Sequence, residues 1–217
     1  MPMILHDYWR SSAAFRVRIG LRLKGLEADR RFVHLVRGEQ RDPAYKARHP
    51  QGFVPMLEDG PHALTQSLAI LEYLEETHPE PPLLPREPAE RARARALALA
   101  IACDIHPLNN LRVLQYLKRE LGADDAARDR WYAHWIAEGF EAVETMLAAR
   151  PGPGPFCLGA TPTLADICLV PQVFNANRYR VPLDPYPAIR AVTEACLALP
   201  AFDLAQPAKQ PDAESPA

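Results

Sequence analysis

The most informative part of this sequence is the run Arg10-Ser11-Ser12-Ala13-Ala14-Phe15-Arg16-Val17-Arg18-Ile19. An apolar stretch from Met3 to Tyr8 is typical of a β-strand, and it leads almost directly into the two serines. Apolar residues then recur at helical spacing until Gly25 ends the pattern. We therefore expect a strand over residues 3–8, followed by a helix over residues 12–24 that begins at the serines.

Ser11 and Ser12 have two interpretations. A serine that precedes a helix commonly caps it, because its hydroxyl accepts a hydrogen bond from a free N–H of the first turn. The same free N–H groups, together with the positive end of the helix dipole, also favour a bound anion. A thiolate is one such anion, and a thiol bound there would have a lowered pKa. Taken alone, this segment favours the capping interpretation.

The composition of the chain excludes several classes of partner. It has 217 residues, of which 48% are hydrophobic and 24% are charged, as in globular proteins that fold in water. The formal net charge of -2 gives no basis for a nucleic-acid or anionic-membrane partner. No apolar run is long enough to span a membrane, and the N-terminus lacks a secretion signal. The expected location is the cytoplasm.

The four cysteines, Cys103, Cys157, Cys168 and Cys196, are scattered along the chain. They form no C-x-x-C pair, and no cluster of cysteine and histidine has the spacing of a zinc site. We therefore expect no metal, and we expect reduced thiols that pack in the interior rather than take part in catalysis.

Residues 1–80 combine strand and helix patterns. Apolar stretches and turn residues, such as Asp59-Gly60-Pro61 between the last two strands, predict the order β-α-β followed by β-β-α. This order is that of a small domain with an open α/β sheet. The remaining elements expected here are strands at 30–35, 54–58 and 62–64 and a helix at 66–77.

The pattern changes after residues 78–88, where five prolines predict a stiff linker. Residues 89–217 are expected to form an all-helical domain, in which Pro107 breaks the first long helix. Thr163-Leu164-Ala165-Asp166 is similar to a capping box, so we assign Asp166 a structural role rather than an acid–base role. The tail after Pro200 is rich in proline and alanine and is expected to be loosely held. The helices expected are 89–102, 108–121, 124–150, one that starts at 163, and 187–199.

Two further segments have features of a ligand site. A cis Val54–Pro55 bond would turn the Val54 N–H and C=O outward to pair with a peptide ligand, but cis bonds are the minority, so the sequence favours trans. Gln66-Ser67 begins another helix, where Ser67 is either a cap or a contact for a carboxylate. The helix starts at Ser11 and Ser67 would then flank a small anionic peptide that carries a thiol.

Taken together, these segments resemble the zeta-class glutathione transferases, the maleylacetoacetate and maleylpyruvate isomerase family. The resemblance covers nearly the whole chain. Its motifs are Arg10-Ser11-Ser12, Arg16-Val17-Arg18-Ile19, Leu23-Lys24-Gly25, Val54-Pro55, Gln66-Ser67-Leu68-Ala69-Ile70, Glu72-Tyr73-Leu74-Glu75-Glu76, Thr163-Leu164-Ala165-Asp166 and Leu169-Val170-Pro171-Gln172-Val173.

The resemblance implies an α/β thioredoxin-like N-terminal domain over residues 1–80, an all-α C-terminal domain over residues 89–217, and a homodimer. It implies an enzyme with glutathione as cofactor, in which Ser11 hydrogen-bonds the sulfur and Ser12 lies nearby. Arg10 and Arg178 are implied to face an acidic substrate. The other glutathione contacts that it implies are Gln40, Val54, Gln66, Ser67, His106, Asn110 and Arg112.

The substrates that the resemblance implies are cis-configured dioxo acids with a carboxylate at each end. A thiolate adds to the double bond, the resulting single bond rotates, and elimination leaves the trans isomer. A free thiol has a pKa of about 8.5, so it needs a hydroxyl donor and a helix N-terminus to ionise at neutral pH. The carboxylates need arginines, and Arg10, Arg178 or His106 would stabilise the negative charge that develops on addition.

The sequence departs from the family at Ala13, where the signature usually reads Ser-Ser-Cys. The departure indicates that the cysteine is not needed to activate glutathione, and it weakens the match to the maleylacetoacetate isomerases. Asp104-Ile105-His106-Pro107, followed by Asn109-Asn110, is more similar to the bacterial maleylpyruvate isomerases.

Three functions fit these residues. The first is a glutathione-dependent isomerase of maleylpyruvate or maleylacetoacetate in aromatic catabolism. The second is a broad glutathione transferase that acts on small electrophiles such as 2-haloacids, and the arginines that bind acids separate it from the first. The third is a non-catalytic binding protein with the same fold, which the presence of Ser11, Val54, Gln66 and Ser67 argues against.

Overall fold

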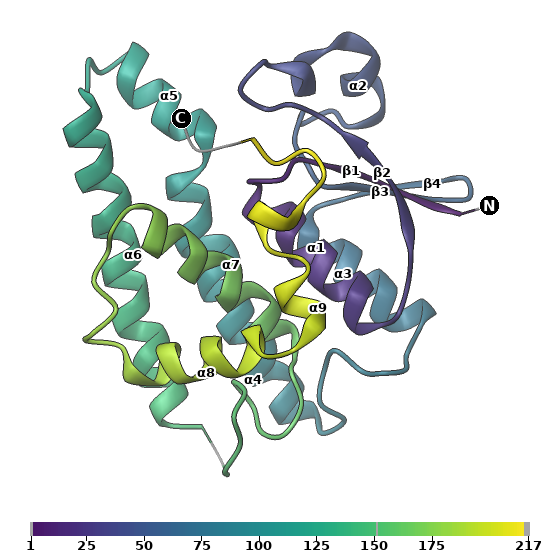
Figure 1. The fold of residues 1–217 in the computed structure, drawn as a ribbon, viewed down its shortest axis with the longest axis vertical. Helices are drawn as coiled ribbons and strands as arrows, with labels where there is room; N and C mark the ends of the chain where they lie inside the picture. Colours follow the sequence, from purple (N-terminus) through teal and green to yellow (C-terminus); the bar gives the residue numbers. More distant parts are fainter. Residues whose placement is uncertain (1, 151, 215–217) are drawn as a thin grey trace. The chain divides into compact units, whose positions relative to one another are not determined.

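The computed structural model describes residues 2–150 and 152–214 of the chain. The contacts among these residues divide them into two compact units. Unit 1 contains the described residues of Met1–Leu83 and of Ala198–Ala217, and unit 2 contains those of Leu84–Leu197. Figure 1 shows the strands in unit 1 and the long helices in unit 2. The expected combination of an α/β region with a helical region is confirmed.

Among the residues described, unit 1 is built on a four-stranded sheet in the order β2-β1-β3-β4. The strands are β1 (Met3–Asp7), β2 (Ala28–Phe32), β3 (Met56–Asp59) and β4 (His62–Thr65). β1 and β2 are parallel, whereas β3 is antiparallel to both of its neighbours, β1 and β4. The order expected from the sequence is confirmed, and β1 is a central strand of the sheet.

One face of the sheet is covered by two helices, α1 (Ser12–Leu23) and α3 (Ser67–Thr77). Leu5 and Leu57 are paired across β1 and β3, and both pack into the core that these helices share with the sheet. The helices lie side by side (Figure 1). Gly20 of α1 permits this contact, because a Cβ at that position would be 2.1 Å from the Leu71 side chain of α3.

The other face of the sheet is covered by α2 (Pro43–Arg48), which the sequence analysis did not predict. Successive side chains of a strand point to opposite faces, so His6 points away from the core that holds Leu5. The His6 ring lies 5.7 Å from the ring of Tyr45 in α2. The sequence feature that could have predicted α2 is Asp42 directly before a proline. The Asp42 carboxylate caps α2 by accepting a hydrogen bond from the Ala44 N–H at 2.8 Å.

The described residues of unit 2 form helices joined by loops, with one isolated β-bridge between Phe156 and Gly159. α7 forms its core, since every residue from Leu164 to Val173 is buried, and it packs against α4 and α8. The expected break at Pro107 is confirmed, because α4 gives way to a π-helical turn at Ala100–Ile105 and a 3₁₀ turn at His106–Asn109. The helices are α4 (Pro88–Leu99), α5 (Leu111–Arg119), α6 (Asp125–Ala148), α7 (Leu164–Arg178) and α8 (Pro187–Leu197).

Asp166 has the structural role expected for it. Its carboxylate accepts hydrogen bonds from the Thr163 N–H at 2.7 Å and from the Cys157 N–H at 2.8 Å, which completes a capping box at the start of α7. Burial raises the pKa of the Asp166 carboxyl, although these hydrogen bonds oppose the rise. Burial likewise raises the pKa of the Cys157 and Cys196 thiols, so both cysteines stay protonated and serve as packing groups.

The C-terminal segment corrects one expectation. Residues 200–214 are not loosely held: they form α9 (Pro200–Asp203) and a 3₁₀ turn at Pro207–Lys209. Arg18 of α1 donates a hydrogen bond to the Ala205 carbonyl, 187 residues further along the chain. Composition gives no sign of this contact, because it depends on single polar groups brought together by the fold. The contacts group this segment with unit 1, whereas the predicted division assigned it to the helical domain of residues 89–217.

Candidate active site

A tight turn connects β1 to α1 and carries the two serines. The Tyr8 carbonyl accepts a hydrogen bond from the Ser11 N–H at 2.9 Å, which closes the turn. Ser11 is the N-cap of α1, and its Oγ accepts a hydrogen bond from the Ala14 N–H at 3.2 Å. Ser12 is the first residue of the helix and is buried. The capping interpretation is therefore confirmed for Ser11.

The start of α1 also has the electrostatic character that an anion requires. The first turn of α1 contains no acidic side chain that would neutralise the positive end of the helix dipole. Arg10, whose guanidinium lies 5.2 Å from the centre of the Trp9 ring, adds a positive charge next to Ser11 in the sequence. A hydroxyl that accepts one hydrogen bond retains its own proton to donate. The role of Ser11 as a donor to sulfur stays a prediction.

The Val54–Pro55 peptide bond is cis, so the expectation of a trans bond is wrong. The expectation came from a frequency averaged over all X-Pro bonds, whereas this proline is buried directly before β3. The preceding carbonyl, that of Phe53, accepts a hydrogen bond from the Tyr45 hydroxyl at 2.6 Å and ties the loop to α2. Within residues 2–150 and 152–214, the Val54 N–H and C=O make no backbone hydrogen bond.

Gln66 has an unusual backbone conformation at the start of α3. Its φ of 68° and ψ of 118° lie in a region that non-glycine residues rarely adopt. Such a backbone conformation destabilises the folded state by about 1–3 kcal/mol, and residues that adopt it are concentrated at active sites and ligand sites. The Gln66 side chain donates a hydrogen bond to Gln51 Oε1 at 2.6 Å, and Ser67 directly after it is buried. The conformation is consistent with a ligand site at this helix start, which stays a prediction.

Gln40 lies on a 3₁₀ turn at Glu39–Arg41 and is buried. Its Nε2 donates a hydrogen bond to the Leu35 carbonyl at 3.2 Å. Its Oε1 is buried without a hydrogen-bond partner among the described residues. The Gln40 backbone packs closely against Gly52, where a Cβ would be 2.7 Å from the Gln40 carbonyl oxygen and where φ is +63°. Glycine at position 52 therefore lets the Gln40 turn approach the loop that contains Val54.

The α2 segment between Gln40 and Gly52 is held to the sheet by polar contacts. Glu58 of β3 is hydrogen-bonded to His6 Nε2, and its other oxygen pairs with the Arg48 guanidinium at 2.5 Å. The hydrogen bond from Arg48 is the main reason why the pKa of the Glu58 carboxyl is lowered. The pKa of His6 is lowered chiefly by burial.

These two shifts predict that acid weakens the fold. A lowered His6 pKa means that the folded state favours the neutral ring, so its contribution is lost as the pH falls below the ordinary value of 6.5. A lowered Glu58 pKa means that the folded state favours the carboxylate, so its contribution is lost as the pH falls below 4.5. Glu58 itself raises the His6 pKa, so the stability that Glu58 loses on protonation is confined to lower pH. We therefore expect Glu58→Gln to reduce the loss of unfolding free energy between about pH 4.5 and about pH 3.

Urea unfolding across that pH range measures this dependence. Glu76→Gln, at an exposed position of α3, is the matched control and should retain the pH dependence of the unmodified protein. A Glu58→Gln variant with the same pH dependence as the control would contradict the prediction.

Unit 2 holds the other four residues that the sequence predicted. His106 begins the 3₁₀ turn, and Asn110 caps α5, where its Oδ1 accepts a hydrogen bond from the Arg112 N–H at 3.1 Å. Arg178 is the last residue of α7 and is exposed, with its guanidinium 4.9 Å from the centre of the Tyr179 ring. Unit 2 thus brings Asn110 and Arg112 together, and it holds Arg178 by a separate aromatic contact.

Comparison with known proteins assigns the family. Residues 1–76 match the family model of the glutathione S-transferase N-terminal domain, and residues 125–195 match that of the C-terminal domain. A probable maleylacetoacetate isomerase of Vibrio cholerae is 50% identical over 215 residues, which cover 98% of this chain and 99% of the relative. A maleylpyruvate isomerase of a Ralstonia species is 50% identical over 210 residues, which cover 97% of this chain and 99% of the relative. This chain belongs to the maleylacetoacetate and maleylpyruvate isomerase family of glutathione S-transferases.

Solved structures from this glutathione transferase family are similar to the present one. A holo maleylpyruvate isomerase, described as a bacterial zeta-class enzyme, has a TM-score of 0.95 at 49% identity, and the match covers 99% of this chain and 100% of that chain. A maleylacetoacetate isomerase from Anaeromyxobacter dehalogenans has a TM-score of 0.87 at 46% identity, and the match covers 99% of this chain and 98% of that chain. The latter holds dicarboxyethyl glutathione and citrate in its active site. The expected thioredoxin-like and helical fold is therefore confirmed.

The sequence analysis did not single out Arg16, which lies beside a candidate site residue of this glutathione transferase. Arg16 is only 2% exposed, and its guanidinium donates a hydrogen bond to the Ser67 hydroxyl at 3.3 Å. It therefore adds a positive charge to the N-terminus of α3, where the helix dipole is also positive. The available signal was an arginine placed directly between Phe15 and Val17 in the apolar part of α1.

Among the described residues, no group of three or more histidine, cysteine, aspartate or glutamate side chains is arranged to hold a metal ion. None of the helices in residues 2–150 and 152–214 combines the length and the apolar character needed to cross a membrane.

Proposed function

We propose that this protein converts a maleyl dioxo acid, maleylpyruvate or maleylacetoacetate, into its trans, fumaryl isomer with glutathione as the cofactor. The observation that carries the proposal is the Ser11 hydroxyl at the start of α1, which accepts the Ala14 N–H and retains a proton to donate. Two relatives that match over nearly their whole length are named as isomerases of these two acids.

The groups available in unit 1 fit glutathione. Val54 offers an N–H and a C=O without backbone partners among the described residues, and these suit the peptide backbone of the cysteinyl residue. Ser67, Gln66 and the buried Arg16 at the start of α3 suit the carboxylate of the γ-glutamyl residue. The buried Gln40 side chain is a candidate partner for the glycyl end. His106, Asn110 and Arg112 of unit 2 are further proposed contacts.

The main task of unit 1 is to ionise a thiol. When bound, glutathione supplies the thiolate that adds to the double bond and leaves after the bond has rotated. The Ser11 hydroxyl donates a hydrogen bond to the sulfur, with Ser12 adjacent, and the positive end of α1 stabilises the anion. Both effects lower the pKa of the thiol from its ordinary value of about 8.5.

Arginines are proposed to bind the substrate. Arg10 and Arg178 hold its carboxylates, because the planar guanidinium can donate two parallel hydrogen bonds to one carboxylate. An arginine or His106 also stabilises the negative charge that develops on the substrate's carbonyl oxygen. The solved relative that binds dicarboxyethyl glutathione together with citrate supports an acidic substrate.

We further propose that the protein acts as a cytoplasmic homodimer without a nucleic-acid partner, with an N-terminal domain over residues 1–80 and a C-terminal domain over residues 89–217. The formal net charge of -2 supports the absence of a nucleic-acid partner, and the family resemblance supports the dimer. Light scattering on the purified protein should give twice the mass of one chain. The mass of a single chain would contradict the dimer.

The test of the proposed function is an isomerase assay of the purified protein with each maleyl acid, with and without glutathione. With glutathione present, we expect the protein to isomerise at least one of the two acids. Without glutathione, we expect it to isomerise neither. The acid with the larger kcat/KM identifies the preferred substrate. Isomerisation at the same rate without glutathione, or turnover of neither acid, would overturn the proposal.

A further inference from the structure

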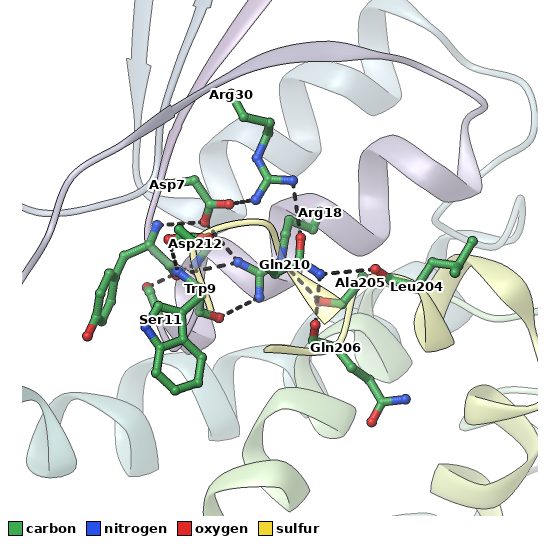
Figure 2. A network of polar contacts seen from close by, with 12 residues as sticks. Asp7, Trp9, Ser11, Arg18, Arg30, Leu204, Ala205, Gln206, Gln210 and Asp212 are labelled. Atoms are coloured by element: carbon green, nitrogen blue, oxygen red, sulfur yellow. Dashed lines mark hydrogen bonds and ion pairs between the residues drawn. The ribbon is translucent and has the colours of Figure 1, made fainter. Parts of the chain in front are cut away.

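A cluster of charged and polar side chains lies under the turn that carries Ser11 (Figure 2). Its charged members come from four parts of unit 1: Asp7 ends β1, Arg18 lies in α1, Arg30 lies in β2 and Asp212 belongs to the C-terminal segment. Asp7 is paired with Arg18 at 2.9 Å and also with Arg30. The two carboxylates balance the two guanidinium groups, so the cluster is electrically neutral.

Arg18 connects this cluster to the turn and to the C-terminal segment. It is only 2% exposed, and its guanidinium donates hydrogen bonds to the Trp9 carbonyl at 2.9 Å and to the Tyr8 carbonyl at 3.4 Å. Its Nε donates to the Ala205 carbonyl at 3.0 Å. Burial lowers the pKa of Arg18 to about 9, and the charge of Asp212 opposes that shift, so Arg18 is a cation at neutral pH.

The backbone of the turn is held from several directions. The Tyr8 N–H donates to Asp7 Oδ1 at 2.8 Å, and the Tyr8 carbonyl accepts the Ser11 N–H at 2.9 Å. The Trp9 N–H donates to Asp212 Oδ2 at 2.9 Å, across 203 residues of sequence. Asp212 is thus the point at which the C-terminal segment holds the backbone two residues before Ser11 (Figure 2).

The C-terminal segment is itself held in place for this contact. Gln210 is buried, and its Nε2 donates to the carbonyls of Leu204 at 3.0 Å and Gln206 at 2.7 Å. Its Oε1 accepts a hydrogen bond from Arg30 at 3.3 Å. Because Arg30 is also paired with Asp7, the segment before Asp212 is fixed to the same cluster that holds the turn.

We propose that Asp212 is a positioning residue for Ser11: it holds the Trp9 N–H so that the turn presents the Ser11 hydroxyl to the thiol. The proposal rests on the proposed function, in which Ser11 donates to the sulfur. The C-terminal segment is then part of the machinery that ionises the thiol, although it lies at the far end of the chain. A misplacement of about 1 Å at a reacting group costs up to about a hundredfold in rate, so the loss of one such contact should be measurable.

The experiment compares Asp212→Ala, which removes the acceptor, with Asp212→Asn, which keeps an oxygen acceptor for the Trp9 N–H. We expect Asp212→Ala to lower kcat about tenfold, to leave KM for the acid nearly unchanged, and to raise the pKa of the bound thiol. Asp212→Asn should keep most of the kcat of the unmodified protein, and its bound thiol should have a pKa close to that of the unmodified protein. The thiol pKa is measured by titrating the ultraviolet absorbance of the thiolate in the glutathione complex.

The matched control is Asp203→Ala in the same segment, where the carboxylate pairs with Lys209 and not with the turn. It should leave kcat and the thiol pKa as they are in the unmodified protein. An unchanged thiol pKa in Asp212→Ala would overturn the positioning role. A decrease in kcat in Asp212→Asn as large as that in Asp212→Ala would overturn it as well.

Hydrogen exchange of the unmodified protein tests the same contact without any variant. The Trp9 amide should be protected, and exchange at the rate of an unbonded amide would overturn the proposal even if Asp212→Ala fails to fold. Failure of the proposed function has a different signature: the unmodified protein would then turn over neither maleyl acid in the presence of glutathione. Failure of the positioning role alone leaves that turnover, and the thiol pKa, intact in both Asp212 variants.

Discussion

Replacing Ser11 with alanine should lower kcat for isomerisation by about a hundredfold to a thousandfold, the range seen when a single hydrogen-bond donor to a developing anion is removed. The same substitution should raise the pKa of the bound glutathione thiol towards the free value of about 8.5. The reason is that Ser11 is the N-cap of α1 and has a hydroxyl proton left to donate. Steady-state kinetics at saturating glutathione and titration of the thiolate measure the two effects.

Two further substitutions separate this role from helix capping, whose loss costs about 1 kcal/mol of stability. Ser11→Thr keeps both the cap and the donor, and it should retain most of the activity. Ser11→Asp keeps the cap but places a negative charge at the sulfur site, so it should fold normally and fail to ionise the thiol. A Ser11→Ala variant with a normal thiol pKa would contradict the role of Ser11.

Replacing Arg178 with methionine should lower kcat/KM for the maleyl acid by roughly tenfold to a hundredfold, the worth of a hydrogen bond to a charged group. Conjugation of glutathione to a neutral electrophile should change little, because such a substrate has no carboxylate to bind. Arg178 is exposed at the end of α7 and lies over the Tyr179 ring, so its removal should not disturb the core. Kinetics with both substrates measure the difference.

Arg180→Met is the matched control, since it removes the same charge from an exposed position two residues away. It should leave kcat/KM for the acid close to that of the unmodified protein. An equal loss of both activities in Arg178→Met would instead favour a broad transferase. Arg10→Met should show the same selective loss for the acid if both arginines bind carboxylates.

Local patterns predicted most of the fold. The apolar stretch before the serines and the helical spacing after them predicted β1 and α1, because both signals lie within a few consecutive residues. Thr163 and Asp166 predicted the start of α7 for the same local reason. The short α2 was not predicted, because it has only 6 residues and none of them is buried, so it shows no apolar periodicity.

Contacts between distant residues were beyond local patterns. The cis bond at Val54–Pro55 depends on the fold around it, so a frequency could only favour trans. Arg16 and Arg18 are buried in α1, where a sequence pattern expects charged residues to face solvent. The fold of the C-terminal segment depends on Asp212 and Gln210, whose partners lie nearly the whole chain away.

Sequence patterns predicted some residues of the candidate site and missed others, because such patterns report only on neighbouring residues. Ser11 and Ser67 stand at helix starts, which sequence patterns locate well. The residues that hold them, Arg16 beside Ser67 and Asp212 beside the Trp9 N–H, carry no local signal of that role. The sequence therefore predicted the residues that are proposed to contact glutathione, and it did not predict the residues that hold them in position.

A crystal structure of this protein soaked with glutathione tests the central claim most directly. The quantity to measure is the distance between the glutathione sulfur and the Ser11 hydroxyl oxygen. We predict that the two atoms lie within hydrogen-bonding distance, with the sulfur at the first turn of α1. A fully occupied glutathione molecule whose sulfur lies away from Ser11 and from the start of that helix would contradict the account.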